Sequence, residues 1–69
     1  MKIKVNGMEK DIKLKNEKAL LSNTIKILGY KPNTVVVEVN DLIINSTKWD
    51  NEVIKDGDRL EIVSIVGGG

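Results

Sequence analysis

The stretch Asp56-Gly57-Asp58-Arg59-Leu60-Glu61-Ile62-Val63-Ser64-Ile65-Val66 decides the fold, because it joins a tight turn to a long alternating segment. Asp56-Gly57-Asp58 favours a turn, since glycine adopts positive φ at no steric cost and aspartate side chains hydrogen-bond to nearby backbone groups. Polar and apolar residues alternate from Arg59 to Ile62, and β-branched residues continue to Val66, which predicts a strand over Arg59 to Val66. Three glycines, Gly67, Gly68 and Gly69, follow. The sequence therefore predicts a last strand that leads into a flexible glycine tail.

The opposite end of the chain predicts a β-hairpin. Lys2 to Asn6 alternates polar and apolar residues, as does Lys10 to Leu14. Asn6-Gly7 between them is a strong hairpin dipeptide, because both residues tolerate positive φ. We expect these two strands to share one apolar face, made of Ile3, Val5, Ile12 and Leu14.

The segment from Glu17 to Leu28 is long enough for a helix of about three turns. Asn16 is a suitable N-cap, and Gly29 suits a left-handed C-cap. Apolar residues recur at helical spacing along one stripe of this segment. The stripe comprises Leu20, Leu21, Ile25 and Leu28.

Shorter elements follow the helix. Thr34 to Val39 is rich in β-branched valine and predicts a strand, and Leu42 to Ile44 predicts a second, short one. Ser46 is expected to cap a single helical turn, Thr47 to Asp50. That turn carries Trp49, which we interpret as a large core residue rather than an exposed binding anchor.

The order of elements is hairpin, helix, strands. It predicts an α+β protein in which one main helix packs across a mixed sheet of four to five strands. A chain of 69 residues is expected to form one domain. We place that domain at residues 1–66 and a flexible glycine tail at residues 67–69.

Composition argues against several classes of chemistry. The chain has no cysteine and no histidine, so it lacks a thiol nucleophile, the commonest general base and the commonest metal ligands. Its 11 basic and 10 acidic residues give a net charge of +1, which does not favour nucleic-acid binding. We therefore expect no catalytic residue, bound metal or cofactor in this chain, and no nucleic-acid partner.

Location and assembly are also expectations at this point. The alternating start does not resemble a signal peptide, and no apolar run approaches the roughly 20 residues of a membrane span. We expect a cytoplasmic protein that does not contact membranes and is monomeric when alone.

Two aspartates in Asp56-Gly57-Asp58 are too few oxygen ligands for a calcium loop, so we interpret that motif as a turn.

Strand alternation predicts a partner-binding surface beside the tail. If Leu60 and Ile62 face the core, Val63 and Ile65 face the other way. Val36 on a neighbouring strand would join them if the alternate valines face the helix. An exposed apolar patch in this position favours a partner interface over scattered surface residues. The predicted interface comprises Val36, Val63, Ile65 and Val66.

The whole chain resembles the ThiS family of sulfur carriers from thiamin biosynthesis. The resemblance is carried by Val39-Asn40, Trp49, Asp56-Gly57-Asp58-Arg59-Leu60-Glu61-Ile62-Val63 and the terminal Val66-Gly67-Gly68-Gly69, with support from Lys2-Ile3-Lys4-Val5-Asn6-Gly7 and Ala19-Leu20-Leu21. It implies the β-grasp, or ubiquitin-like, fold. This chain departs from many relatives at Ile44-Asn45-Ser46 and at Glu38, both away from the tail.

The resemblance also implies a mechanism and partners. A ThiF-type adenylyltransferase, which supplies the ATP and Mg²⁺ site, would adenylate the carboxylate of Gly69. A cysteine-desulfurase-derived sulfur donor would then convert it to a thiocarboxylate. The thiocarboxylate would deliver sulfur to a ThiG-type thiazole synthase. Gly67 and Gly68 would enter the partners' active sites, and no enzyme activity of this chain's own is implied.

Glycine suits this use on physical grounds. Without side chains the backbone fits a narrow channel, and at about 3.3–3.6 Å per extended residue a short tail reaches well beyond its domain. Alternatives remain at this point: a MoaD-type sulfur carrier for molybdopterin synthesis, a ubiquitin-like protein modifier, or a β-grasp binding module without tail chemistry. A frayed terminus is the simplest alternative for the glycines alone.

Overall fold

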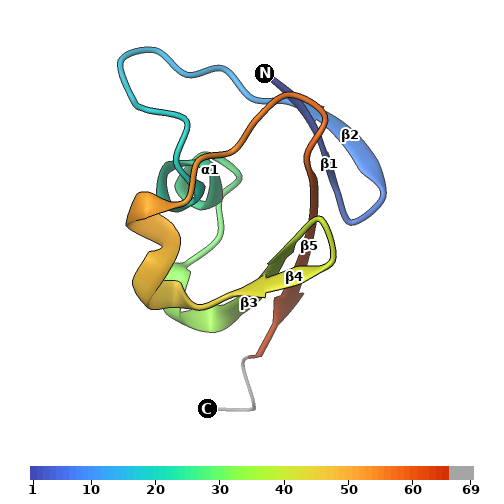
Figure 1. The fold of residues 1–69 in the computed structure, drawn as a ribbon, viewed down its shortest axis with the longest axis vertical. Coiled ribbons are helices and arrows are strands. Elements are labelled where there is room, and N and C mark those ends of the chain that lie inside the picture. Colours follow the sequence, from blue (N-terminus) through green and yellow to red (C-terminus); the bar gives the residue numbers. More distant parts are fainter. Residues whose placement is uncertain (66–69) are drawn as a thin grey trace.

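The computed structural model describes residues 1–65, in which one α-helix packs across a five-stranded mixed sheet (Figure 1). The strands are β1 (Lys2–Val5), β2 (Met8–Asp11), β3 (Val35–Val39), β4 (Leu42–Ile44) and β5 (Arg59–Ser64). The helix is α1 (Leu21–Ile27), and η1 (Pro32–Thr34) and η2 (Ser46–Asn51) are short 3₁₀ helices.

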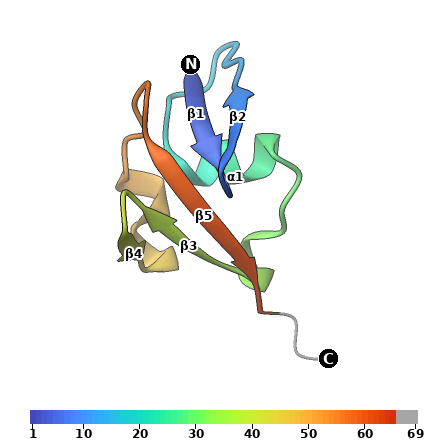
Figure 2. The same cartoon turned by 90° about the vertical axis from the view of Figure 1, so that its right-hand side faces the viewer.

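The sheet order is β2-β1-β5-β3-β4, so the last strand occupies the centre. β1 and β5 are parallel, whereas β1–β2, β3–β5 and β3–β4 are antiparallel. Figure 2 shows β5 running diagonally across the molecule between β1 and β3. This arrangement confirms the predicted β-grasp fold.

The hairpin is tighter than the sequence suggested. Asn6 and Gly7 both have positive φ, 52° and 82°. This two-residue turn pairs Val5 directly with Met8, so β2 begins at Met8 instead of Lys10 and ends at Asp11. Ile12 therefore lies outside the strand, yet it is still buried.

The helix begins four residues later than predicted, at Leu21, and Asn16 does not cap it. Residues just before the helix are extended because they hydrogen-bond to the segment after η2. Ile54 N–H donates to the carbonyl of Ala19 at 2.8 Å, and Leu21 N–H donates to that of Glu52 at 2.8 Å. These long-range bonds outweigh the helical propensity of Ala19 and Leu20.

The end of the helix is as expected. Gly29 has φ 91°, its N–H donates to the Lys26 carbonyl, and the next N–H, of Tyr30, donates to the Ile25 carbonyl. These two bonds form a Schellman motif, which satisfies carbonyls that a helix end would leave unpaired.

The core lies between α1 and the sheet. It comprises Ile3, Val5, Ile12, Leu21, Ile25, Val35, Val37, Val39, Trp49, Ile54, Leu60 and Ile62. Leu14, Leu28, Tyr30 and Ile44 pack against it while partly exposed. Trp49 is 3% exposed, and its indole N–H donates to the Ile44 carbonyl at 2.9 Å, which confirms its prediction as a core residue.

Smaller differences concern element ends. Thr34 belongs to η1, so β3 starts at Val35. The turn that carries Trp49 is the longer η2, and its N-cap is Asn45, whose side chain accepts a hydrogen bond from Thr47 N–H, instead of Ser46. β5 ends at Ser64, two residues before the predicted end.

Candidate functional site

The candidate site is the end of β5 together with the sheet surface beside it. β5 is flanked by β1 on one side and β3 on the other, and pairs with β3 along its whole length, from Val39↔Leu60 to Val35↔Ser64. Ile65 continues this pairing, since its N–H donates to the Thr34 carbonyl at 2.8 Å. The predicted Val66 contact, the lead-in Gly67 and Gly68, and the reactive Gly69 lie outside the described residues.

An apolar surface lies on the sheet face opposite α1. Val36 and Val63 are direct cross-strand partners, and their side chains are 36% and 56% exposed. Ile65 is 55% exposed and follows on the same side of the chain. The structure thus places these three predicted residues together, because Leu60 and Ile62 are buried and strand alternation turns their neighbours outward.

Ile43 extends this surface and was missed by the sequence reasoning. It is 67% exposed and pairs with Glu38, which puts it on the same outer face of the sheet. A shallow hollow lies where Ile43, Ile65 and Val36 meet Asn45 and Ser46. The Leu42–Ile44 strand had been predicted, but its pairing register with β3, which decides the face of Ile43, is a tertiary property. Val36, Ile43, Val63 and Ile65 are called the apolar surface below.

The other half of the same sheet face is charged. Lys4 pairs with Glu9 of β2 and with Arg59 of β5, and all three side chains are exposed. Arg59 also forms an exposed ion pair with Asp41 at 3.1 Å. The outer face therefore changes from charged to apolar along β5, toward the tail.

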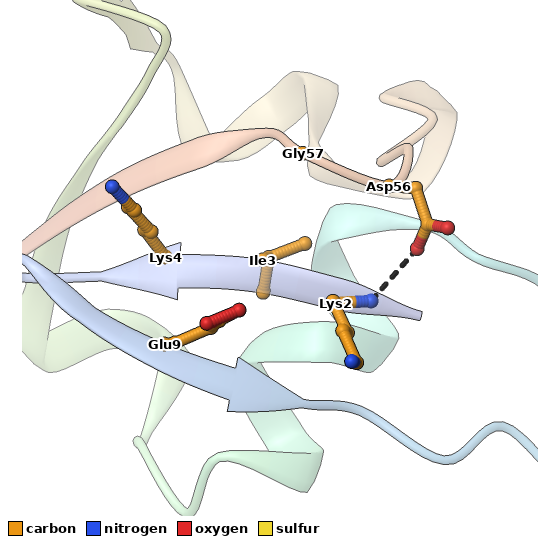
Figure 3. Close-up of a pocket in the computed structure, with 6 residues that line it drawn as sticks. All are labelled: Lys2, Ile3, Lys4, Glu9, Asp56 and Gly57. Atoms are coloured by element: carbon orange, nitrogen blue, oxygen red, sulfur yellow. Dashed lines mark hydrogen bonds between the residues drawn. The ribbon is translucent and has the colours of Figure 1, made fainter.

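The Asp56-Gly57-Asp58 turn has a structural role at the start of β5. The Asp56 carboxylate accepts a hydrogen bond from Lys2 N–H at 2.7 Å, and Gly57 N–H donates to the Lys2 carbonyl at 2.7 Å. Figure 3 shows this contact, with the charged ends of Lys2, Lys4 and Glu9 pointing in different directions around it. The turn thus ties β5 to β1. The hollow drawn in Figure 3 is lined by Lys2, Ile3, Lys4, Glu9, Asp56 and Gly57, and their charged groups do not converge on one point.

Asp58 ties the same turn to the other neighbour of β5. Its carboxylate accepts hydrogen bonds from Lys55 N–H at 2.8 Å and from the side-chain amide of Asn40 at 3.0 Å.

Over residues 1–65, no group of three or more Asp or Glu side chains is arranged to hold a metal ion. In the same part of the chain, no helix is long and apolar enough to cross a bilayer.

The fold and the site define a class: a β-grasp domain whose central strand ends beside an apolar surface and is followed in the sequence by Val66 and three glycines. The model of the ThiS family matches residues 3–69, almost the whole chain. The chain therefore belongs to the ThiS family, whose members are small sulfur carrier proteins.

Solved structures agree with this assignment. The crystal structure of the thiamine biosynthesis protein ThiS from Geobacter metallireducens is 25% identical, covers all of both chains and superposes with a TM-score of 0.80. A solution structure of a thiamine biosynthesis protein from the same organism is 27% identical, with a TM-score of 0.79 over all of this chain and 88% of that one.

Sequence relatives add a second kind of similarity. The uncharacterized protein ycf40 of Trieres chinensis is 35% identical over 49 residues, which are 71% of this chain and 67% of that protein. A thiazole synthase of Paramagnetospirillum magneticum is 36% identical over 70 residues, which cover all of this chain but only 20% of that protein. The chain thus resembles a small segment of that much longer protein.

Proposed function

We propose that this protein carries sulfur for thiazole formation in thiamin biosynthesis, through the carboxylate of Gly69. The observation that carries the proposal is the ThiS family match, which runs through the glycine tail to residue 69. The described part of the chain supports it, because β5 directs the chain past an exposed apolar surface toward that tail.

The chemistry begins with activation of a poor electrophile. A terminal carboxyl group has a reference pKa of about 3.3–3.7 and is therefore ionised at neutral pH. In the proposed first step, a carboxylate oxygen of Gly69 attacks the α-phosphorus of ATP, and pyrophosphate leaves. The product is an acyl-adenylate, whose AMP is a good leaving group.

In the second step a sulfur nucleophile attacks the carbonyl carbon of the acyl-adenylate. The C–O bond to AMP breaks, AMP leaves with the electron pair, and a thiocarboxylate remains when the nucleophile is hydrosulfide. The sequence contains neither a Gly-x-x-x-x-Gly-Lys-Ser/Thr loop nor a Gly-x-Gly-x-x-Gly motif. We therefore assign ATP and Mg²⁺ binding to a partner, and the family resemblance implies that this partner is of the ThiF type and that a cysteine-desulfurase-derived donor supplies the sulfur.

A thiazole synthase is the proposed acceptor of the sulfur. The Paramagnetospirillum magneticum protein that bears this name holds a segment similar to this entire chain. Sharing one polypeptide is what would be expected of a carrier and an enzyme that work together. We assign the apolar surface as the docking site for these partners, since exposed apolar patches of this kind favour protein interfaces.

The test is the intact mass of the full chain after incubation with a ThiF-type enzyme, Mg²⁺-ATP and sulfide. Replacement of one oxygen by sulfur is expected, and a variant that lacks Gly69 should show none. An unchanged mass with an enzyme that modifies another ThiS protein would refute the proposal. Lysine-linked conjugates would favour a protein modifier, and selective capture of a molybdopterin synthase subunit would favour a MoaD-type carrier.

A further inference from the structure

Two asparagines hold β5 from its two sides by the same device. Asn6 follows β1 and Asn40 follows β3, so each ends a strand that flanks β5. Both have left-handed backbones, with φ of 52° and 51°. In this conformation the chain turns away from the neighbouring strand, and the ladder of backbone hydrogen bonds ends.

At both positions the side-chain amide continues the ladder. The Asn40 side-chain oxygen accepts a hydrogen bond from Arg59 N–H at 3.0 Å, at the start of β5. The Asn6 side-chain oxygen accepts one from Ile62 N–H at 2.7 Å, and its amide nitrogen donates to the Ile62 carbonyl at 3.2 Å. Asparagine meets both needs, because it tolerates positive φ and its amide has the donor and acceptor of a peptide group.

The Asn6 contact is in the second half of β5, where support from the β1 side is limited. The β1–β5 pairing ends at Val5↔Leu60, and the Asn6 N–H to Leu60 carbonyl bond of 2.8 Å is the last backbone contact. Within residues 1–65, the next contact of β5 on this side is the Asn6 carboxamide with Ile62. Beyond Leu60, the backbone pairing of β5 in residues 1–65 is with β3, on the opposite side from β1.

We propose that Asn6 is a positioning residue: by clamping Ile62, it holds the end of β5 so that the apolar surface and the tail meet a partner in one fixed relation. This inference rests on the proposed sulfur-carrier function. Ile62 is followed directly by Val63, the exposed centre of the apolar surface, so movement at Ile62 moves the docking residues and the point where the tail begins. Ordering costs are lower when a docking segment is already held in place.

The test compares Asn6→Gly with Asn40→Gly in the full chain. Each substitution keeps the left-handed turn, since glycine adopts positive φ freely, and each removes two side-chain hydrogen bonds. The two variants should therefore lose similar stability. They differ in which residue of β5 is released, Ile62 or Arg59, so Asn40→Gly serves as the matched control.

The first readout does not depend on any partner. Amide hydrogen exchange at Ile62 and Val63 should accelerate by about three- to tenfold in Asn6→Gly relative to Asn40→Gly, as expected for one lost hydrogen bond. Asn6→Asp keeps the acceptor for Ile62 N–H and should restore part of the protection. Equal exchange in Asn6→Gly and Asn40→Gly would overturn the clamp.

The second readout is thiocarboxylate formation by the activating enzyme. Asn6→Gly should raise the KM for the carrier by about three- to tenfold relative to Asn40→Gly, because a loosened strand must be ordered on docking. Equal KM values alongside an active wild-type chain would overturn the positioning role alone. Absence of thiocarboxylate on the wild-type chain would refute the proposed function, while the exchange measurement would still decide the clamp.

Discussion

The two ends of β5 present opposite chemistry on the same sheet face. Near its start, Arg59 and Glu61 are exposed among other charged residues, whereas Val63 and then Ile65 are exposed near its end. The inner face does not change in this way, since Leu60 and Ile62 are both buried. An exposed apolar cluster of this kind favours a protein interface, so the proposed docking site lies at the end of β5 that precedes the glycines.

Neighbouring residues on opposite faces should give the largest contrast in stability. Ile62→Ala should lower the free energy of unfolding by about 2–5 kcal/mol, because it leaves a cavity in the core. Val63→Ala, one residue later and exposed, should cost less than about 1 kcal/mol. Urea denaturation monitored by the fluorescence of buried Trp49 measures both, and similar losses would contradict the assignment of the two faces.

The apolar end should matter most for partner binding. Val63→Asp is expected to weaken affinity for the ThiF-type enzyme by about ten- to a hundredfold, since a desolvated carboxylate would be buried in the interface. Lys4→Asp, on the charged half of the same face, is the control and should change affinity much less. Isothermal titration decides the matter; equal affinities for wild type and Val63→Asp would rule out this docking surface.

The turn before β5 should contribute moderately to stability and little to docking. Asp58→Ala removes acceptors for Lys55 N–H and the Asn40 amide, which should cost about 1–2 kcal/mol. Thermal unfolding of Asp58→Ala, compared with that of the exposed control variant Asp50→Ala, measures this loss of stability. A loss of partner affinity in folded Asp58→Ala comparable to that of Val63→Asp would show that the charged end also binds.

The smallest effect is expected at the exposed ion pair of the charged end. Asp41→Asn keeps a residue that tolerates the positive φ of 71° at this position but removes the charge opposite Arg59. Both side chains are more than half exposed, so the stability change should stay below about 0.5 kcal/mol. A larger change in denaturation at low salt would indicate a wider charge network on this half of the sheet.

Most of the fold could be predicted from residue patterns. Alternation identified the inner and outer residues of β3 and β5, and the Asn6-Gly7 and Gly29 positions were correctly assigned to positive φ. The outward direction of Val36, Val63 and Ile65 followed from the same alternation. These features are local, because a two-residue period or a glycine acts on the backbone without help from distant parts of the chain.

The two features missed at the site depend on distant partners. Ile43 joins the apolar surface only through the register of β4 on β3, and Asn6 reaches Ile62 only because β1 and β5 are parallel neighbours. A single sequence shows the exposed or turn-forming character of such residues but not what lies opposite them.

What the sequence by itself determined is therefore the character of each segment: which residues face inward, where the chain turns, and which family the glycine-ended chain resembles. The tertiary structure decided where segments begin and what they touch. Ala19 and Leu20 illustrate the limit, since both belong to a helical pattern yet lie outside α1: Ala19 accepts a hydrogen bond from Ile54 N–H, and Leu20 is extended beside Val53. The physical reason is that buried backbone groups must find partners, and a partner supplied by a remote strand outweighs a weak local preference.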